Sequence, residues 1–305
     1  MPELFFTLML VILCILPNLA VGQEILTVPF TIDRNRVIIP TSVNDSSPLR
    51  LILDSGMGFD GVYLFHLSDL GLIDTTGAVT VNVGGAGDGE ASTATMIETG
   101  HIAFGEVTVP NQRIIVSHSS HTRQFPTDGV VGWNFFGHYI VEIDYDQNMI
   151  FLHDTTDTTA DSSWLCLPIE LKKNLPFLDI TVEVIPGEVV PMRVYIDLAS
   201  EEALELLIHD QQKFTMPDSV IESSLGYGLS GEIKGRHGKS AGLQIGKYML
   251  HDIRTAFAPA KVRSKQEGAN GILGNNPIRR FNIIFDYPHN CLYIKPNRNF
   301  EIPFD

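Results

Sequence analysis

Two aspartates are the residues of this chain whose surroundings best suit joint chemistry. Asp54 ends the largely apolar run at residues 49–53, and Asp197 ends a similar run at residues 193–196. A lone Asp-Ser-Gly turn means little, because all three residues are common in turns. Two strands that each deliver an aspartate predict a pair of carboxylates. Such a pair shares one proton, because like charges at about 3 Å cannot both ionise. We therefore expect an acid–base pair.

The positions of the two aspartates coincide with an internal repeat. They are 143 residues apart. The glycine–apolar–apolar–glycine segments at 129–132 and 271–274 are 142 residues apart, and so are the Asp-Tyr pairs at 144–145 and 286–287. Three separate features that share one offset within a residue indicate a duplicated unit.

Each unit is predicted to be rich in strands. Both have a hairpin, the aspartate-bearing strand, a glycine-tipped hairpin, further strands, a glycine–apolar–apolar–glycine segment, a helical turn and a final hairpin. The polar, low-complexity segment 154–163 is typical of a linker. The sequence thus predicts an all-β fold class, with a lobe at 24–153 that carries Asp54 and a lobe at 164–305 that carries Asp197.

Two further segments are expected to be short helices. Residues 64–71 end at a glycine, and residues 200–208 have the composition of a helix. An alternative role for Asp197 follows from the second of these, since an aspartate before a helix can cap its first turn. That alternative does not explain the offset shared by the two halves.

Glycine-tipped hairpins could cover a site between the lobes. The hairpin at 79–97 carries Gly85, Gly87 and Gly89 at its tip, and a second hairpin begins near Tyr227. A phosphate-binding loop would need a helix directly after the glycines, whereas a strand-like stretch follows here. We therefore expect a mobile flap, with an ordinary solvent-exposed hairpin as the alternative.

Composition and charge exclude several classes of function. The chain has 305 residues with 44% hydrophobic content, which is enough for two lobes with proper cores. Its net charge of −15 argues against nucleic acid and against an anionic membrane surface. His118 and His121 lie in a Ser-rich stretch without further candidate ligands, so we expect no metal and no other cofactor.

The N-terminus has the features of an export signal. Residues 4–16 form an almost unbroken apolar run, and small residues at 20 and 22 fit a cleavage site. We expect a signal peptide at 1–22 and a mature chain that is periplasmic or extracellular and free of the membrane, with an uncleaved membrane anchor as the alternative. The mature chain keeps Cys166 and Cys291, which form a disulfide or stay as buried thiols.

These motifs resemble the aspartic proteases of the pepsin and retropepsin type, especially the two-lobed retropepsin-like bacterial members. The resemblance covers residues 25–294 and rests on Asp54-Ser55-Gly56 and two apolar-apolar-glycine segments. In that family such segments thread behind the aspartate loops in a ψ-shaped motif, and their residues here are Val130, Val131, Gly132, Ile272, Leu273 and Gly274. The resemblance implies two closed, barrel-like β lobes with a cleft between them.

The resemblance also implies an activity, that of an aspartic endopeptidase. In that mechanism the ionised aspartate polarises a water molecule and the protonated one donates to the peptide carbonyl oxygen. Neither a metal nor a covalent nucleophile is required. The expected substrate is an extended peptide or an unfolded protein, bound in the cleft of a monomer.

The second aspartate loop departs from the family pattern. Ser55 can hydrogen-bond to the opposite loop and Gly56 leaves room for it, as in the family. Leu198 stands where the family has Thr or Ser, and Ala199 stands where it has Gly. The reciprocal hydroxyl bond is therefore lost. These departures motivate the alternative of a catalytically weakened or inactive protein that binds peptides on a protease fold.

Overall fold

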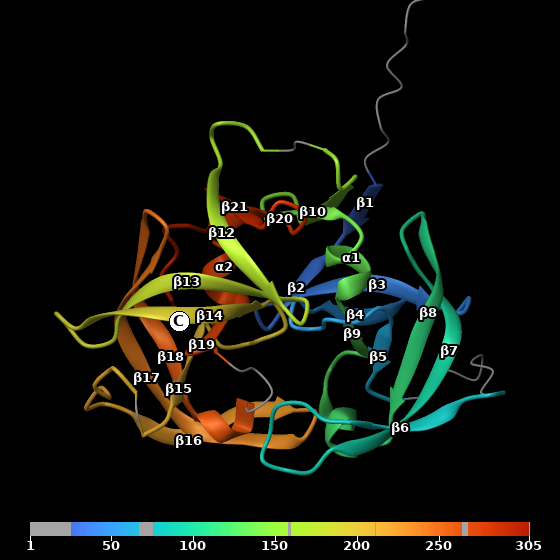
Figure 1. Ribbon diagram of the computed structural model, residues 1–305, viewed down its shortest axis with the longest axis horizontal. Coiled ribbons are helices and arrows are strands. Elements are labelled where there is room, and N and C mark those ends of the chain that lie inside the picture. Colours follow the sequence, from blue (N-terminus) through green and yellow to red (C-terminus); the bar gives the residue numbers. More distant parts are fainter. Residues whose placement is uncertain (1–25, 67–75, 158–159, 211, 264–267, 305) are drawn as a thin grey trace, which may run out of the picture.

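The computed structural model describes residues 26–66, 76–157, 160–210, 212–263 and 268–304, and its regular structure is nearly all β (Figure 1). The predicted signal peptide at 1–22 and most of the predicted helix at 64–71 lie outside these residues. Within them, no helix is long and apolar enough to cross a membrane.

The first half of the chain consists mainly of strands and hairpins. The strands are β1 (Leu26–Pro29), β2 (Thr31–Asp33), β3 (Arg36–Val43), β4 (Leu49–Leu53), β5 (Val62–Leu64), β6 (Val79–Val83), β7 (Ser92–Phe104), β8 (Val107–Ser117), β9 (Gly129–Val131), β10 (Ile140–Asp144) and β11 (Met149–His153). The helical elements are the 3₁₀ turn η1 (His121–Gln124) and α1 (Trp133–Phe136), which lies where the sequence predicts a helical turn.

The second half follows β11 after the predicted linker at 154–163. Its strands are β12 (Leu165–Lys172), β13 (Leu175–Glu183), β14 (Val189–Asp197), β15 (Leu204–Ile208), β16 (Ile221–Gly228), β17 (Gly231–Ile245), β18 (Tyr248–Pro259), β19 (Gly271–Gly274), β20 (Phe281–Asp286) and β21 (Cys291–Pro296). Its helical elements are η2 (Ala260–Arg263) and α2 (Asn275–Ile278).

The aspartate-bearing strands β4 and β14 lie in the core of their halves. Leu51 and Leu53 of β4 and Val194 and Ile196 of β14 are all fully buried. A continuous apolar run is what a strand needs when both of its faces are covered. Packing in the core therefore fixes where each strand ends, and with it the position of the aspartate at that end.

The same strand pairing occurs in both halves and explains the repeat in the sequence. β4 pairs in parallel with β9, and β14 pairs in parallel with β19. β9 then pairs antiparallel with β5, as β19 does with β15. β5 pairs in parallel with β8, as β15 does with β18. The two glycine–apolar–apolar–glycine segments are thus the central strands β9 and β19, each beside an aspartate-bearing strand.

A shared sheet joins the two halves. β10 of the first half pairs antiparallel with β20 of the second, so that β1, β11, β10, β20, β21 and β12 lie side by side at the top of Figure 1. The disulfide between Cys166 of β12 and Cys291 of β21 lies in this sheet, with 5.8 Å between the two Cα atoms. The sheet gives the two aspartate loops one common support.

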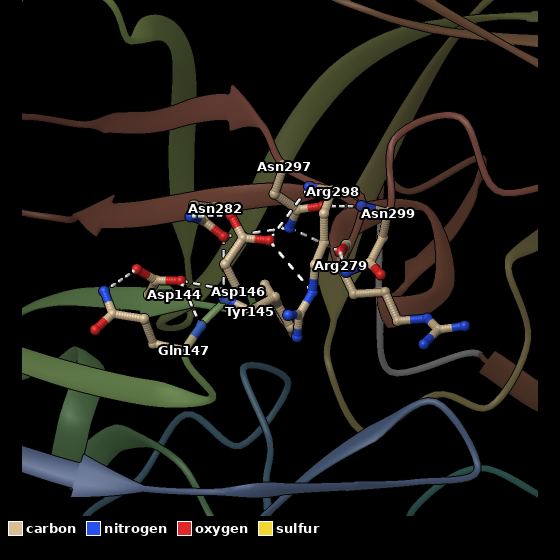
Figure 2. A network of polar contacts seen from close by, with 9 residues as sticks. All are labelled: Asp144, Tyr145, Asp146, Gln147, Arg279, Asn282, Asn297, Arg298 and Asn299. Carbon is tan, nitrogen blue, oxygen red and sulfur yellow. Dashed lines mark hydrogen bonds and ion pairs between the residues drawn. The ribbon is translucent and has the colours of Figure 1, made fainter.

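A polar network closes the same junction (Figure 2). The backbone N–H of Tyr145 donates to Asn282 Oδ1 at 3.0 Å, and Asp146 accepts from the backbone N–H of Arg298 at 3.2 Å. Asp144 accepts the backbone N–H groups of Asp146 and Gln147 in its own turn. The Asp-Tyr turn of the first half is therefore bound to the second half, which restrains the angle between them.

The predicted helix at 200–208 is wrong, because residues 204–208 form strand β15. Leu204 and Leu206 are fully buried, and β15 lies between β18 and β19 in the sheet. Glu, Ala and Leu favour a helix locally, but a strand at this place gains pairing on both sides and burial on both faces. Tertiary context therefore overrides local propensity here.

Candidate active site

Asp54 and Asp197 lie on the wall of one cleft with a volume of about 1140 Å³. Parallel pairing positions each of them. The backbone N–H of Asp54 donates to the carbonyl of Val131 at 2.8 Å, and Asp197 is in register with Gly274. The central strands β9 and β19 thus hold the two aspartates at equivalent positions in the two halves.

The two carboxylates converge on the first aspartate loop. The Gly56 N–H donates to Asp54 Oδ1 at 2.7 Å, and the Ala199 N–H donates to Asp197 Oδ1 at 2.9 Å. A Cβ atom added to Gly56 would lie 3.0 Å from Asp54 Oδ1 and 3.7 Å from Asp197 Oδ2. Both carboxylates therefore border the space that glycine leaves open. The Ala199 N–H thus makes the same contact to Asp197 as the Gly56 N–H makes to Asp54, and the Ala199 methyl group packs against the core beside the cleft.

Burial and like charge keep a proton on the pair. Asp54 is partly exposed, yet protein atoms surround its carboxyl group densely. This desolvation, followed by the negative charge of Asp197, raises the pKa of Asp54 to about 8, while the Gly56 N–H acts in the opposite direction. At neutral pH the pair thus holds one proton, which is the state that acid–base chemistry by two carboxylates requires.

One hydroxyl group joins the two aspartate loops. The Ser55 Oγ donates to the carbonyl of Ile196 at 2.8 Å and accepts from the N–H of Leu198 at 3.1 Å. Ser55 is only 2% exposed, so water does not compete for these bonds. Leu198 has no hydroxyl to return the contact, and its side chain is fully buried in the core. Of the two loops, the first thus provides the side-chain hydroxyl and the second provides backbone groups.

We expect the substitution Ser55→Ala to lower the free energy of unfolding by about 1–3 kcal/mol, because it leaves the Ile196 carbonyl and the Leu198 N–H buried without a partner. Urea unfolding followed by fluorescence measures the change. Ser47→Ala, at an exposed serine outside the cleft, is the matched control and should change stability by less than about 0.5 kcal/mol. Equal stability of the two variants would show that the bridge contributes nothing.

Two glycines, Gly132 directly after β9 and Gly274 at the end of β19, are required by close packing. A Cβ atom on Gly132 would collide with the Asp54 carbonyl oxygen, and one on Gly274 would collide with the carbonyl oxygen of Glu202. The residues before these glycines belong to the same two strands, with Val130 and Val131 in β9 and Ile272 and Leu273 in β19. Both segments therefore lie in contact with the backbone of the aspartate loops.

Two hairpin tips, one from each half, meet over the cleft. The tip between β6 and β7 contacts the turn between β16 and β17 through Ser230. This residue accepts from Gly89 N–H at 2.8 Å, donates from its own N–H to Ala86 O at 3.0 Å, and accepts from Gly85 N–H on its hydroxyl at 3.1 Å. Gly87 has φ +126°, and a Cβ atom there would collide with the backbone of Ser230. The predicted flap therefore has a partner from the other half.

Other residues of the cleft were not singled out by sequence reasoning. Tyr227, which sequence reasoning did single out, lies on the wall of the cleft, and its side chain is 43% exposed. Ser230 was not singled out, although a serine at the turn of a glycine-rich hairpin is a weak sequence signal for a residue of this kind. Arg36 and Glu201 also line the cleft and form an ion pair at 3.0 Å. His118, considered above as a ligand, hydrogen-bonds to two threonines of β7 instead.

Comparison with known proteins supports the fold. No family model matches the sequence, and no curated protein matches it either. Among solved structures, the chain is similar to the crystal structure of the aspartic proteinase from Irpex lacteus, with a TM-score of 0.58 and 12% identity over 92% of this chain and 100% of that one. The chain therefore has the two-lobed, all-β fold of the acid proteases, and at this identity the similarity shows the fold alone.

Proposed function

We propose that this chain is an aspartic-type endopeptidase of the two-lobed, retropepsin-like kind, with Asp54 and Asp197 as its catalytic residues. The observation that carries the proposal is the convergence of two carboxylates, with one raised pKa, on the wall of a large cleft. A fold similar to that of an aspartic proteinase adds support. The hairpin tips above the cleft fit a substrate that enters as an extended chain.

The reaction follows from the protonation of the pair. Asp54, whose pKa is raised, carries the proton and donates it to the carbonyl oxygen of the scissile peptide bond. Asp197 is ionised and takes a proton from a water molecule, which attacks the carbonyl carbon. The tetrahedral intermediate then collapses: one of its hydroxyl groups returns a proton to Asp54, the C–N bond breaks, and the leaving amine takes the proton held by Asp197. The Gly56 and Ala199 N–H groups hold both carboxylates in place.

The rival function is peptide binding without cleavage, on the same fold. Leu198 and Ala199 motivate it, because the second loop lacks the family's hydroxyl and glycine. Two contacts favour the enzyme. Ser55 still joins the loops, and the Ala199 N–H still supports Asp197.

The test is a digest of an unbiased peptide library and of an unfolded protein, from about pH 3 to about pH 9, read by mass spectrometry. We expect internal cleavage that a statine-type transition-state mimic blocks. Tight binding of the mimic without cleavage at any pH would favour the rival function. Cleavage that the mimic leaves untouched would reject the aspartate mechanism.

We also propose that the protein is exported to an oxidising compartment, the periplasm or the exterior. The Cys166–Cys291 disulfide supports this, since such bonds persist where thiols are not kept reduced.

A further inference from the structure

Arg36 is a buried arginine at one end of the cleft. It begins β3, directly after the turn at Arg34 and Asn35, and is only 4% exposed. Its Nη1 atom pairs with Glu201 Oε1 at 3.0 Å. Its Nε and Nη2 atoms are buried and have no hydrogen-bond partner among the residues that the structure describes, and the side chain borders the cleft. One edge of a buried guanidinium group is thus left unmatched.

The unmatched edge has the geometry that recognises a carboxylate. The Nε–H and the nearer Nη2–H of an arginine point in parallel, so that they can donate to both oxygens of one carboxylate. Leaving two such donors buried without acceptors is costly. Burial also lowers the pKa of Arg36, against the opposing effect of Glu201. A second anion at this edge would satisfy the donors and stabilise the charge.

The other end of the cleft has a different chemistry at the equivalent position. The turn between β12 and β13 has positive φ at Lys173 and Asn174, as the β2–β3 turn has at its two residues. It places Leu175 where the first turn places Arg36. Leu175 also lines the cleft.

The loops that face the two turns also differ, since one carries a charged residue where the other carries a glycine. The Asn174 side chain donates to the carbonyl of Gly58 at 2.8 Å, and the Asn35 side chain donates to the carbonyl of Glu201 at 3.5 Å. Gly58 is the fourth residue after Asp54, as Glu201 is after Asp197. One end of the cleft is therefore built from arginine and glutamate, and the other from leucine and glycine.

The charges around Arg36 favour an anion at this corner of the cleft. Arg34 is 4.0 Å from Glu201, so two arginines share one carboxylate at this corner. The next glutamate, Glu202, is paired with His237 at 2.7 Å and lies 3.8 Å from Arg254. Asp33 and Arg50, which also act on Arg36, pair with each other at 2.9 Å, so the corner formed by the two arginines and Glu201 keeps an excess of positive charge.

We propose that the Arg36 end of the cleft binds a carboxylate group of the substrate and that the Leu175 end binds an apolar side chain, so that peptides bind in one direction. This inference rests on the proposed endopeptidase function. The carboxylate belongs to an Asp or Glu side chain or to the C-terminus of a short peptide, and the two sources share the same chemistry.

The test uses quenched fluorescent peptides based on a cleaved library sequence, with Glu or Gln at each position in turn and with a free or amidated C-terminus. For at least one such pair, we expect the kcat/KM of the wild type to be about tenfold higher for the peptide with the carboxylate than for the peptide without it. A preference for Glu over Gln identifies a side chain, and a preference for the free acid over the amide identifies the terminus.

Three variants assign the preference to Arg36. Arg36→Leu should bring the ratio close to one, whereas Glu201→Gln should raise it, because the arginine then has no competing partner. Arg113→Leu, at a half-exposed arginine that pairs with Glu98 outside the cleft, should leave the ratio unchanged.

The outcomes separate this inference from the proposed function. Cleavage with no carboxylate preference at any position overturns the inference and leaves the endopeptidase function standing. A preference that survives Arg36→Leu also overturns the inference. If Arg36→Leu does not fold, Glu201→Gln decides, since an unchanged or lower ratio contradicts the proposal. Cleavage of no peptide by the wild type overturns both proposals.

Discussion

Asp54→Asn should lower kcat/KM for peptide cleavage by about a thousandfold. Asparagine has the shape of aspartate and can still accept the Gly56 N–H, so the loop should keep its geometry. It cannot release and regain a proton, and the raised pKa makes Asp54 the member of the pair that carries it. The measurement is the initial rate on the best library peptide at several pH values, with the variant purified in parallel with the wild type.

The control for this variant is Asp60→Asn. Asp60 lies a few residues further along the same loop, pairs with His138 at the surface and does not line the cleft. Its substitution should leave kcat/KM within about twofold. Asp197→Asn should lose as much activity as Asp54→Asn, because the pair acts as one unit. An Asp54→Asn protein that cleaves as fast as the wild type would rule out the mechanism.

The departure at Leu198 changes how the second loop is held rather than whether it reaches the site. Leu198 is fully buried in the core, so packing anchors the loop from behind. Its backbone N–H still meets Ser55 in front. A leucine here therefore exchanges one hydrogen bond for apolar burial, and Ala199 still brings its N–H to Asp197. The asymmetry of the pair is one of support, because the Ser55 hydroxyl makes both hydrogen bonds described between the loops.

Much of the central fold could be predicted because its signals are local. An apolar strand buried on both faces leaves a continuous apolar run, and a glycine is required where another backbone comes too close. Gly132 and Gly274 meet carbonyl oxygens of the aspartate loops in just this way. Because both halves pack in the same way, the same spacing of residues recurs in the sequence. This spacing identifies Asp197 as the counterpart of Asp54.

What could not be predicted depends on contacts between distant segments. Residues 204–208 have helical composition, and only the neighbours β18 and β19 make them a strand. Ser230 joins the two hairpin tips across 145 residues of sequence. Nothing in the local sequence distinguishes Arg36 from the other arginines, and only the fold places it in a buried position beside Glu201. None of these contacts leaves a period or a motif in the local sequence.

The free energy of unfolding should fall as the pH rises from about 4 to about 8, through the ionisation of Asp54. The folded protein holds a proton on this carboxyl up to about pH 8, whereas the unfolded chain releases it near its ordinary pKa of 3.8. Between these values unfolding releases one proton, so a higher pH favours the unfolded state. The slope expected from this group is about −1.4 kcal/mol per pH unit, and it ends above pH 8.

Comparing the wild type with Asp54→Asn isolates this contribution from that of the other titrating groups. Urea unfolding at each pH gives the two curves, and their difference should change in favour of the variant as the pH rises. The variant thus loses activity and gains relative stability at neutral pH, which a loss of fold cannot produce. Asp60→Asn should run parallel to the wild type. Parallel curves for Asp54→Asn would mean that Asp54 ionises as in water, and the shared proton on which the cleavage mechanism depends would then be absent.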